Sequence, residues 1–295
     1  MKPGPLTLRR PASVEECLGL LRSEQEAVVK VISGGQSLMP LLALRMANPD
    51  VLVDIGRLDE LMHLEVGPEA VRIGARVRHH QLTEEPLRSL LPVLAEAAGH
   101  IGHTAIRNRG TIGGSLAHAD PAAELPAVMV LLGAEIECRS ASAGTRLMPA
   151  AEFFTGPYLT TLADDELLTA VHVRRPVSGT GHGFVEFSPR HGDYARAGAL
   201  AMLSPGPDSR IAAARLVLFA VANRPVDVSE HVEIAIGVRP EECDWVSIAQ
   251  AAVASLPAPT DADRADRHRL ALAVTRRALQ RAAAGIAATR GRHGQ

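Results

Sequence analysis

The chain of 295 residues is longer than a usual single domain, so we expect two or three packed units. Its formal net charge of −2 and its 3% of aromatic residues argue against nucleic acid as a partner, because a basic surface and base-stacking rings are both scarce. Cys17, Cys138 and Cys243 are far apart and include no C-x-x-C pair, which predicts reduced thiols and no zinc or iron–sulfur ligation on this chain.

Neither a membrane span nor a secretory signal is expected from the sequence. No apolar run is long enough to cross a bilayer, and the N-terminal segment MKPGPLTLRRPAS has no apolar core. We therefore expect a cytoplasmic protein, which a complex could hold at the inner face of the membrane.

The first predicted unit is a βαβ unit. Ser13 and Glu16 have the spacing of a capping box ahead of an apolar stripe, which predicts a short amphipathic helix. Buried strands are expected at residues 28–32 and 51–55, which are rich in β-branched residues, with a helical segment at 38–46 between them. Ligands of such units gather at the carboxyl ends of the strands.

Helices and strands also alternate in the middle of the chain. Apolar residues at helical spacing within 87–98 predict two helices divided at Pro92, and a further helix is expected over 125–132. Residues 147–153 are expected to form a connection. Strands are expected at three runs of apolar or β-branched residues, 70–75, 134–138 and 166–173.

A segment rich in Gly, Ser and Thr, residues 177–183, predicts a linker to a C-terminal unit. Antiparallel strands and two helices are expected there. The arginine-bearing second helix is interpreted as solvated or subunit-facing rather than as a nucleic-acid site. The expected strands are 184–188, 197–203 and 216–221, and the expected helices are 245–255 and 263–284.

Two diglycine runs are the main candidates for a binding site. Each has hydroxyl residues beside it and lies next to an apolar run. Glycine adopts positive φ and lets the backbone approach a ligand, and successive N–H groups of such turns form a concave anion site. One diglycine is typical of an ordinary turn, but two such runs predict loops that grip one diphosphate: Ser33-Gly34-Gly35-Gln36-Ser37 and Thr111-Ile112-Gly113-Gly114-Ser115.

Longer segments around these runs resemble the FAD-binding (medium) subunits of the molybdenum hydroxylases, the xanthine dehydrogenase family, and especially the medium chains of the carbon-monoxide-dehydrogenase type. The resemblance extends in order and spacing over essentially the whole chain. The segments that carry it are VISGGQSLMPLLALRMANPDVLVDI at 31–55, IRNRGTIGGSLAHADPAAELPAVMVLLGAEI at 106–136 and RHGDYARAGA at 190–199.

The fold that this resemblance implies is α+β. A two-part FAD-binding domain of the PCMH/vanillyl-alcohol-oxidase type, residues 1–176, would consist of a small βαβ unit (about 1–57) and a mixed sheet with helices (58–176). A small C-terminal α+β domain with an antiparallel sheet and helices, typical of the carbon-monoxide-dehydrogenase flavoproteins, would follow at 177–295.

The resemblance also implies non-covalent FAD, since the first run contains no His or Cys that could form a covalent link. It implies that the pyrophosphate contacts Ser33, Gly34, Gly35, Gln36, Ser37, Thr111, Ile112, Gly113, Gly114 and Ser115. The family more often has Asn at the position of Ser115.

Residues outside the two runs complete the implied FAD site. Two positions of this chain depart from the family pattern: Pro189 occupies a place where many relatives have a basic residue, and Glu186 falls near a place where some relatives have a lysine close to the flavin. The implied contacts are Ile101 near the isoalloxazine, Glu124 at the ribose with Asp120 as a neighbouring candidate, Leu168 at the adenine, and Asp193 and Tyr194 at the flavin ring.

The function implied by the resemblance is electron transfer. A large subunit would carry the molybdenum cofactor and a small subunit two [2Fe–2S] clusters, as a dimer of heterotrimers with this chain. This chain would pass electrons from the clusters to an external acceptor, a task that demands no catalytic acid or base of its own. The substrate of the complex and its acceptor stay open.

Two alternatives and one competing site type remain. The chain could be a stand-alone FAD-dependent oxidoreductase that uses Asp193 or Tyr194 as an acid–base group, or a scaffold that has lost FAD. The histidines, among them His100 and His103 at i, i+3, have no Cys or carboxylate at ligand spacing. We therefore predict no metal site and interpret these two, His79, His80 and His118 as surface or loop residues.

Overall fold

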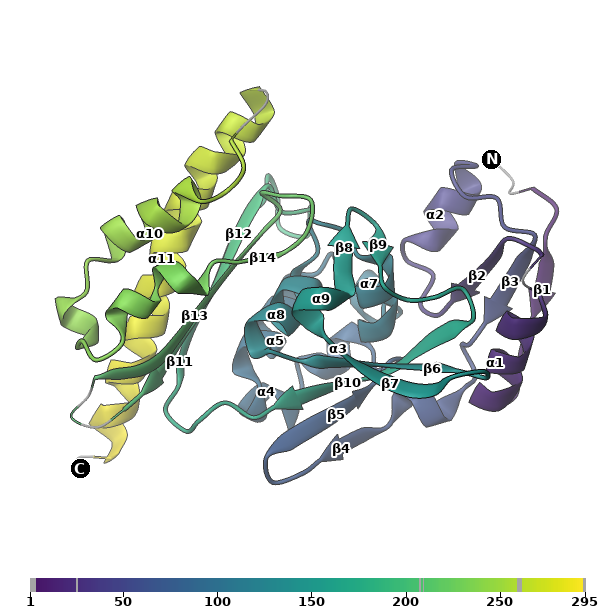
Figure 1. The fold of residues 1–295 in the computed structure, drawn as a ribbon, viewed down its shortest axis with the longest axis horizontal. Coiled ribbons are helices and arrows are strands. Elements are labelled where there is room, and N and C mark those ends of the chain that lie inside the picture. Colours follow the sequence, from purple (N-terminus) through teal and green to yellow (C-terminus); the bar gives the residue numbers. More distant parts are fainter. Residues whose placement is uncertain (1–3, 25, 207, 209, 259–261, 294–295) are drawn as a thin grey trace.

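The computed structural model describes residues 4–24, 26–206, 208, 210–258 and 262–293. The molecule is elongated, with a small parallel sheet at one end, a helix-covered sheet in the middle and a second sheet with a long helix at the other end (Figure 1). Within the described ranges, no helix is both long and apolar enough to cross a bilayer.

The N-terminal part is the predicted βαβ unit with one added strand. Its strands pair in parallel in the order β1-β3-β2. Ser13 caps the first helix by accepting the N–H of Glu16 at 3.1 Å, as the capping-box spacing predicts. The second strand is only half-buried, whereas the sequence predicts a buried strand. The elements are β1 (Thr7–Arg9), α1 (Val14–Ser23), β2 (Val29–Ile32), α2 (Leu38–Ala43) and β3 (Val51–Asp54).

The central part is a five-stranded sheet in the order β4-β5-β10-β6-β7. Its elements begin with a 3-10 turn, η1 (Asp59–Met62), and include a two-stranded ribbon, β8 with β9. The strands are β4 (Leu64–Val66), β5 (Ala70–Gly74), β6 (Glu135–Ser140), β7 (Gly144–Pro149), β8 (Phe154–Gly156), β9 (Leu159–Thr160) and β10 (Glu166–Arg174).

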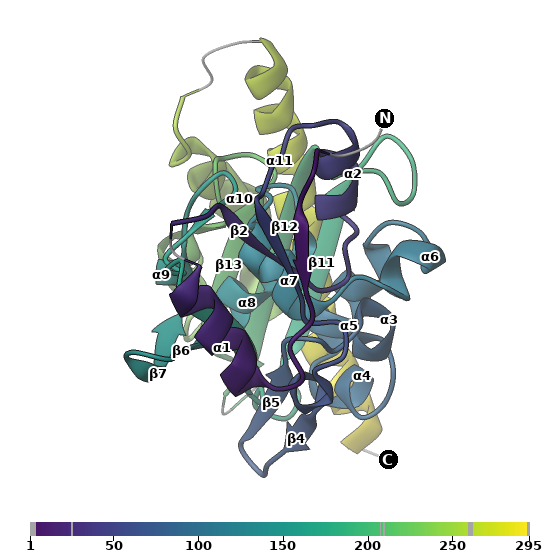
Figure 2. The ribbon, with the colours of Figure 1, turned by 90° about the vertical axis from the view of Figure 1, so that its right-hand side faces the viewer.

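Helices fill the excursion between β5 and β6 and cover one face of the central sheet (Figure 2). Pro92 divides two of them as predicted, and Gly133 ends the fully buried α8 in the left-handed conformation. These helices are α3 (His79–Leu82), α4 (Leu87–Leu90), α5 (Pro92–His100), α6 (Thr104–Arg107), α7 (Ile112–His118) and α8 (Glu124–Leu132). A further short helix, α9 (Ala150–Phe153), follows β7.

Two details of the central sheet differ from the prediction. All its pairings are antiparallel rather than mixed, because β4–β5 and β6–β7 are hairpins and β10 inserts between them in the opposite direction. Residues 147–153, expected as a connection, instead end the strand β7 and form α9. Exposed side chains alternate along this edge strand, which leaves little apolar signal.

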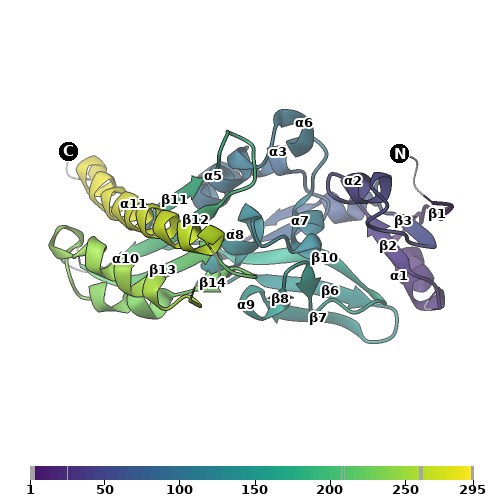
Figure 3. The same ribbon diagram turned by 90° about the horizontal axis from the view of Figure 1, so that it is seen from above.

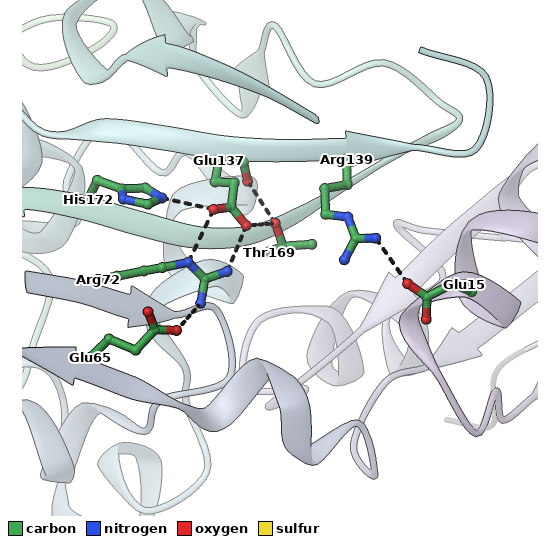
Figure 4. A network of polar contacts seen from close by, with 7 residues as sticks. All are labelled: Glu15, Glu65, Arg72, Glu137, Arg139, Thr169 and His172. Carbon is green, nitrogen blue, oxygen red and sulfur yellow. Dashed lines mark hydrogen bonds and ion pairs between the residues drawn. The ribbon is translucent and has the colours of Figure 1, made fainter. Parts of the chain in front are cut away.

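A buried carboxylate joins three strands of the central sheet. Glu137 on β6 accepts hydrogen bonds from Arg72 (2.7 Å), Thr169 (2.6 Å) and His172 (2.8 Å) on the two strands beyond it (Figure 4). Close by, an ion pair of 3.0 Å between Arg139 and Glu15 links the sheet to α1. These polar contacts stabilise the strand order on the face away from the helices.

The C-terminal part is an antiparallel sheet, as predicted, and its strand order is β11-β12-β13-β14. The helix α11 runs along one face of it (Figure 3) and extends nine residues beyond the predicted end at 284. The elements are β11 (Gly181–Phe187), β12 (Ala197–Pro205), β13 (Ile211–Phe219), β14 (Val226–Asp227), η3 (Ser229–His231), η4 (Glu233–Ala235), η5 (Pro240–Glu242), α10 (Trp245–Ala254) and α11 (Ala262–His293).

The C-terminal sheet is buried on both faces. Leu200, Val217 and Phe219 pack into the core of the central part, next to α8. Leu216 and Leu218, which alternate with them, pack against α10 and α11 in a second core. The central and C-terminal parts therefore share one continuous apolar interface.

Candidate functional site

The two diglycine runs lie side by side although they are 78 positions apart. The hydroxyl oxygens of Ser33 and Thr111 are 3.0 Å apart and share a hydrogen bond. Gly34 lies so close to the carbonyl of Arg109 that any Cβ on it would overlap with that oxygen. The close approach of the two segments therefore depends on glycine at this position.

The first run offers backbone donors. Gly35 has a φ of +72°, and the Gln36 side chain donates back to the carbonyl of Gly34 at 3.0 Å. In the part of the chain that the structure describes, the backbone N–H groups of residues 34–37 donate to no protein acceptor. Consecutive unpaired N–H groups in a turn at the end of a strand are suited to an anion.

The second run is not a loop, which corrects the prediction of two loops. It is the N-terminal turn of α7, with Thr111 as the N-cap. The N–H groups of Ile112 and Gly113 donate to the carbonyls of Val77 (3.0 Å) and Ala75 (2.8 Å). The second run thus uses its backbone donors to attach α7 to the central sheet.

Two further features define the second run. The N–H of Gly114 donates to the Thr111 hydroxyl at 3.1 Å, and that of Ser115 donates to the Thr111 carbonyl at 3.0 Å. The Cα of Gly114 is exposed and the Ser115 side chain is half-buried. Ligand contact at this run would therefore come from a bare glycine surface and a hydroxyl rather than from free N–H groups.

The buried histidine His79 supports the second run. The prediction that His79 lies at the surface or in a loop is wrong. His79 is 6% exposed because α3 packs beneath the turn that precedes α7. Its Nε2–H donates to the carbonyl of Thr111 at 2.9 Å, and its Nδ1 is buried without a partner among the described residues. Burial lowers the pKa of His79 to about 4, so the ring is neutral at pH 7.

Two buried acids follow α7. Asp120 accepts the N–H of Ala122 at 2.9 Å and lies 3.5 Å from the hydroxyl of Tyr158. Glu124, the first residue of α8, is 8% exposed. Burial, and then the nearby charge of Glu186, raise the pKa of Glu124 to about 8, so this carboxyl holds a proton at neutral pH.

The segment that contains Asp193 and Tyr194 lies against the end of α5. A Cβ on Gly192 would lie 3.0 Å from the carbonyl oxygen of Gly102, which shows how closely the two segments pack. Arg107 donates to the carbonyls of Ile101 (3.0 Å) and Gly102 (2.9 Å) and so fixes the segment that follows α5. Asp193 and Tyr194 themselves are exposed.

Leu168 lies on β10, beside an irregularity in the strand pairing at Thr169. The carbonyl of Thr169 accepts the N–H of Ala75 at 2.9 Å, and Ala75 in turn anchors Gly113. The Leu168 side chain is 4% exposed and belongs to the core. Its link to the glycine runs is therefore through the backbone of β10.

Three residues near the site do not stand out in the sequence as functional, and two of them, His79 and His100, are expected there to lie at the surface or in loops. His79 lies under the second run. The Tyr158 ring lies 5.1 Å from the ring of His118, and the backbone N–H of Tyr158 donates to the carbonyl of Ala119. His100, expected at the surface, is half-buried and bonds Glu186 at 3.2 Å. The chain has only two tyrosines, and this scarcity is the one feature of the sequence that could have drawn attention to Tyr158.

Comparison with known proteins gives a consistent result. The family profile described as "FAD binding domain in molybdopterin dehydrogenase" matches residues 4–176. The chain is 36% identical to the caffeine dehydrogenase subunit beta of Pseudomonas sp. strain CBB1, covering 96% of both chains. It is 37% identical to the nicotine 6-hydroxylase medium subunit of Paenarthrobacter nicotinovorans, covering 96% of this chain and 99% of the relative.

A solved structure extends the likeness to three dimensions. A chain of the carbon monoxide dehydrogenase from Hydrogenophaga pseudoflava superposes with a TM-score of 0.91 at 31% identity. The match covers 97% of this chain and 99% of that one. The similarity therefore includes the C-terminal sheet as well as the part that the family profile matches.

Proposed function

Because the chain belongs to the family of FAD-binding subunits of the molybdopterin dehydrogenases, we propose that it carries electrons from [2Fe–2S] clusters of a partner subunit to an external acceptor. Membership makes the chain an FAD-binding subunit of a multi-subunit oxidoreductase. Bound flavin supplies the redox chemistry, since it exchanges electrons singly or in pairs. The protein supplies binding, orientation and electrostatics.

The observation that carries the proposal is the contact between Ser33 and Thr111, which brings the two diglycine runs together. The unpaired N–H groups of residues 34–37 fit the negative charge of a diphosphate. In the second run, Gly114 and the Ser115 hydroxyl lie on the opposite side of the proposed diphosphate position. We assign the pyrophosphate to these groups, with the N–H contacts coming from the first run.

The remaining FAD contacts are assigned as the resemblance implies. Glu124 and Asp120 are assigned to the ribose, and Leu168 to the adenine region. A protonated Glu124 can donate as well as accept a hydrogen bond at a ribose hydroxyl. Ile101, Asp193 and Tyr194 are assigned to the isoalloxazine, because their segments pack together at the end of α5.

The proposed assembly has three kinds of chain. A large subunit carries the molybdenum cofactor, a small subunit carries the clusters, and two such heterotrimers form a dimer. The sparse cysteines of this chain are consistent with clusters on a partner. We propose residues 1–176, with parts at about 1–57 and 58–176, as the FAD-binding domain, and 177–295 as the C-terminal domain.

The test is flavin loading followed by reduction. The full chain is purified with added FAD, and its visible flavin absorption is measured for the wild type, Gly34→Ala and the control Gly19→Ala. Gly34→Ala is expected to lose flavin because a Cβ there would separate the runs, whereas a Cβ at Gly19 meets no atom within 4 Å. The loaded wild type is then mixed with the reduced iron–sulfur partner.

Bleaching of the flavin bands by the reduced partner is the expected result. Flavin that binds but is reduced only by an added organic substrate, without any partner, would contradict the proposal and favour a stand-alone oxidoreductase. A folded wild type that takes up no flavin, alone or with its partners, would contradict it too.

A further inference from the structure

Arg78 contacts the place where the two diglycine runs meet. Its guanidinium donates to the carbonyl oxygen of Arg109, which is the same oxygen that a Cβ on Gly34 would overlap. This one oxygen atom therefore has the Arg78 side chain and the first run packed against it. The charge of Arg78 lies beside Gly34, the first of the four residues whose backbone N–H groups are unpaired among the described residues.

Backbone pairing fixes the direction of the Arg78 side chain. Arg78 lies opposite Thr111 in an antiparallel bridge, and its own N–H donates to Oε1 of Gln81 at 2.8 Å. Residues that lie opposite each other in antiparallel pairing extend their side chains from the same face. On that face, the Thr111 hydroxyl is 3.0 Å from the hydroxyl of Ser33. The Arg78 side chain therefore extends toward the first run.

The positive charge around Arg78 is poorly compensated within the protein. In the part of the chain that the structure describes, neither Arg78 nor Arg109 forms an ion pair, and Arg76 pairs only with Asp59 (3.3 Å), whose side chain is 89% exposed. Burial, and then the like charges of Arg76 and Arg109, lower the pKa of Arg78. Three guanidinium groups are thus gathered with one solvent-exposed carboxylate, an arrangement that a bound anion would stabilise.

We propose that Arg78 and Arg109 neutralise the diphosphate of the cofactor on the first run, Arg78 from its fixed position beside Gly34 and Arg109 from the exposed surface. The inference rests on the proposed function, which assigns the pyrophosphate to the N–H groups of residues 34–37. Backbone N–H groups orient a diphosphate but carry only partial charges. A guanidinium adds a full charge and a fork of donors that matches phosphate oxygens.

Ionic strength separates this role from a purely structural one. An attraction between charges near the surface weakens as salt screens it, whereas a packing defect lowers affinity by the same factor at every salt concentration. The affinity for FAD is therefore expected to fall more steeply with KCl in the wild type than in a variant that lacks one of the two charges.

The first test titrates the flavin-free full chain with FAD at low and at high KCl. Arg78→Gln is expected to bind FAD about tenfold more weakly than the wild type at low KCl, and the difference should shrink at high KCl. Arg78→Lys keeps the charge and is expected to keep most of the salt dependence. Arg88→Gln, which removes an exposed charge paired with Glu85, is the matched control and should behave as the wild type.

Arg109→Gln is the second variant, should Arg78→Gln not fold. The Arg109 side chain makes no hydrogen bond or ion pair with the described residues, so its replacement is expected to leave the fold intact. This variant should also weaken FAD binding at low KCl more than at high KCl. The salt dependence of the wild type in both variants, or a loss of equal size at low and high KCl in Arg78→Gln, overturns the inference.

Inorganic pyrophosphate distinguishes a failure of this inference from a failure of the proposed function. In calorimetric titrations of the flavin-free chain, pyrophosphate is expected to bind the wild type more tightly than Arg78→Gln. Equal binding to both overturns the inference. Pyrophosphate binding of the expected kind in a wild type that takes up no FAD, or FAD that the iron–sulfur partner cannot reduce, contradicts the proposed function and leaves the role of the two arginines standing.

Discussion

At the scale of single residues, Gly113 is the position with least room for a side chain in the second run. A Cβ there would lie 2.6 Å from the Cβ of Ala75 and 2.8 Å from its carbonyl oxygen, which also accepts the N–H of Gly113. We expect Gly113→Ala to destabilise the fold by about 1–3 kcal/mol and to abolish FAD binding. Thermal unfolding and FAD titration measure both effects.

The matched control for that prediction is Gly19→Ala in α1. No atom lies within 4 Å of the new Cβ, and alanine favours the helix by up to about 1 kcal/mol. Unchanged or higher stability is expected, with normal FAD binding. A Gly113→Ala protein that binds FAD as the wild type does would show that the turn tolerates a side chain.

We expect His79 to make FAD binding sensitive to acid. Its pKa of about 4 lies below the ordinary value of 6.5, so the folded state binds fewer protons than the unfolded chain between these values. The stability associated with the neutral ring is complete above about pH 6.5 and decreases as the pH falls toward 4. We expect FAD to dissociate over this range, and His79→Gln to bind FAD more weakly at pH 7 but with a shallower acid dependence.

At the scale of elements, Glu137 joins β5, β6 and β10 (Figure 4). Burial acts to raise the pKa of Glu137, but hydrogen bonds from Arg72, Thr169 and His172 lower it to about 2. Its contribution to stability is therefore complete above the ordinary value of 4.5 and is lost as the pH falls toward 2.

Removing this carboxylate should destabilise the central sheet. We expect Glu137→Gln to lower the free energy of unfolding at pH 7 by about 1.5–3 kcal/mol, because charged hydrogen bonds are lost while the arginine stays in place. Denaturant unfolding at pH 7 and pH 3 tests this, and the difference between variant and wild type should shrink at the lower pH. Glu15→Gln, which affects only the exposed pair with Arg139, is the control.

At the scale of the whole molecule, polar contacts between described residues attach the N-terminal part to the rest. These include the Ser33–Thr111 hydrogen bond, the Arg139–Glu15 pair and the bond from the N–H of Val14 to Glu60 (2.7 Å). A ligand held between the two diglycine runs would join the parts. We expect FAD to protect β2 and α2 from hydrogen exchange and, at 100 times its Kd, to stabilise the fold by about 2.7 kcal/mol.

The sequence was sufficient wherever local chemistry decides the structure. Ser13 as a helix cap, Pro92 as a helix divider and the strand at 166–173 follow from residue type and spacing alone. The features that the sequence did not predict depend on tertiary contacts. The seating of Gly113 on Ala75 and the burial of His79 are set by segments distant in the chain, so no local pattern could separate the first turn of α7 from a loop.

The contact between His100 and Glu186 shows the same limit. Only the packing of β11 against α5 places Glu186 beside His100. Neither segment predicts this contact by itself. The assignment of individual FAD contacts from the sequence stays a prediction, which the variants above address.

The unequal roles of the two diglycine runs bear on the order of events during synthesis. The run with unpaired N–H groups emerges from the ribosome first, whereas the rigid turn that faces it follows 78 positions later. That turn is seated on Ala75, whose own N–H needs the carbonyl of Thr169 on β10. Cofactor capture by a nascent chain therefore has to wait for most of the central sheet, and chains stalled before β10 should be released without flavin.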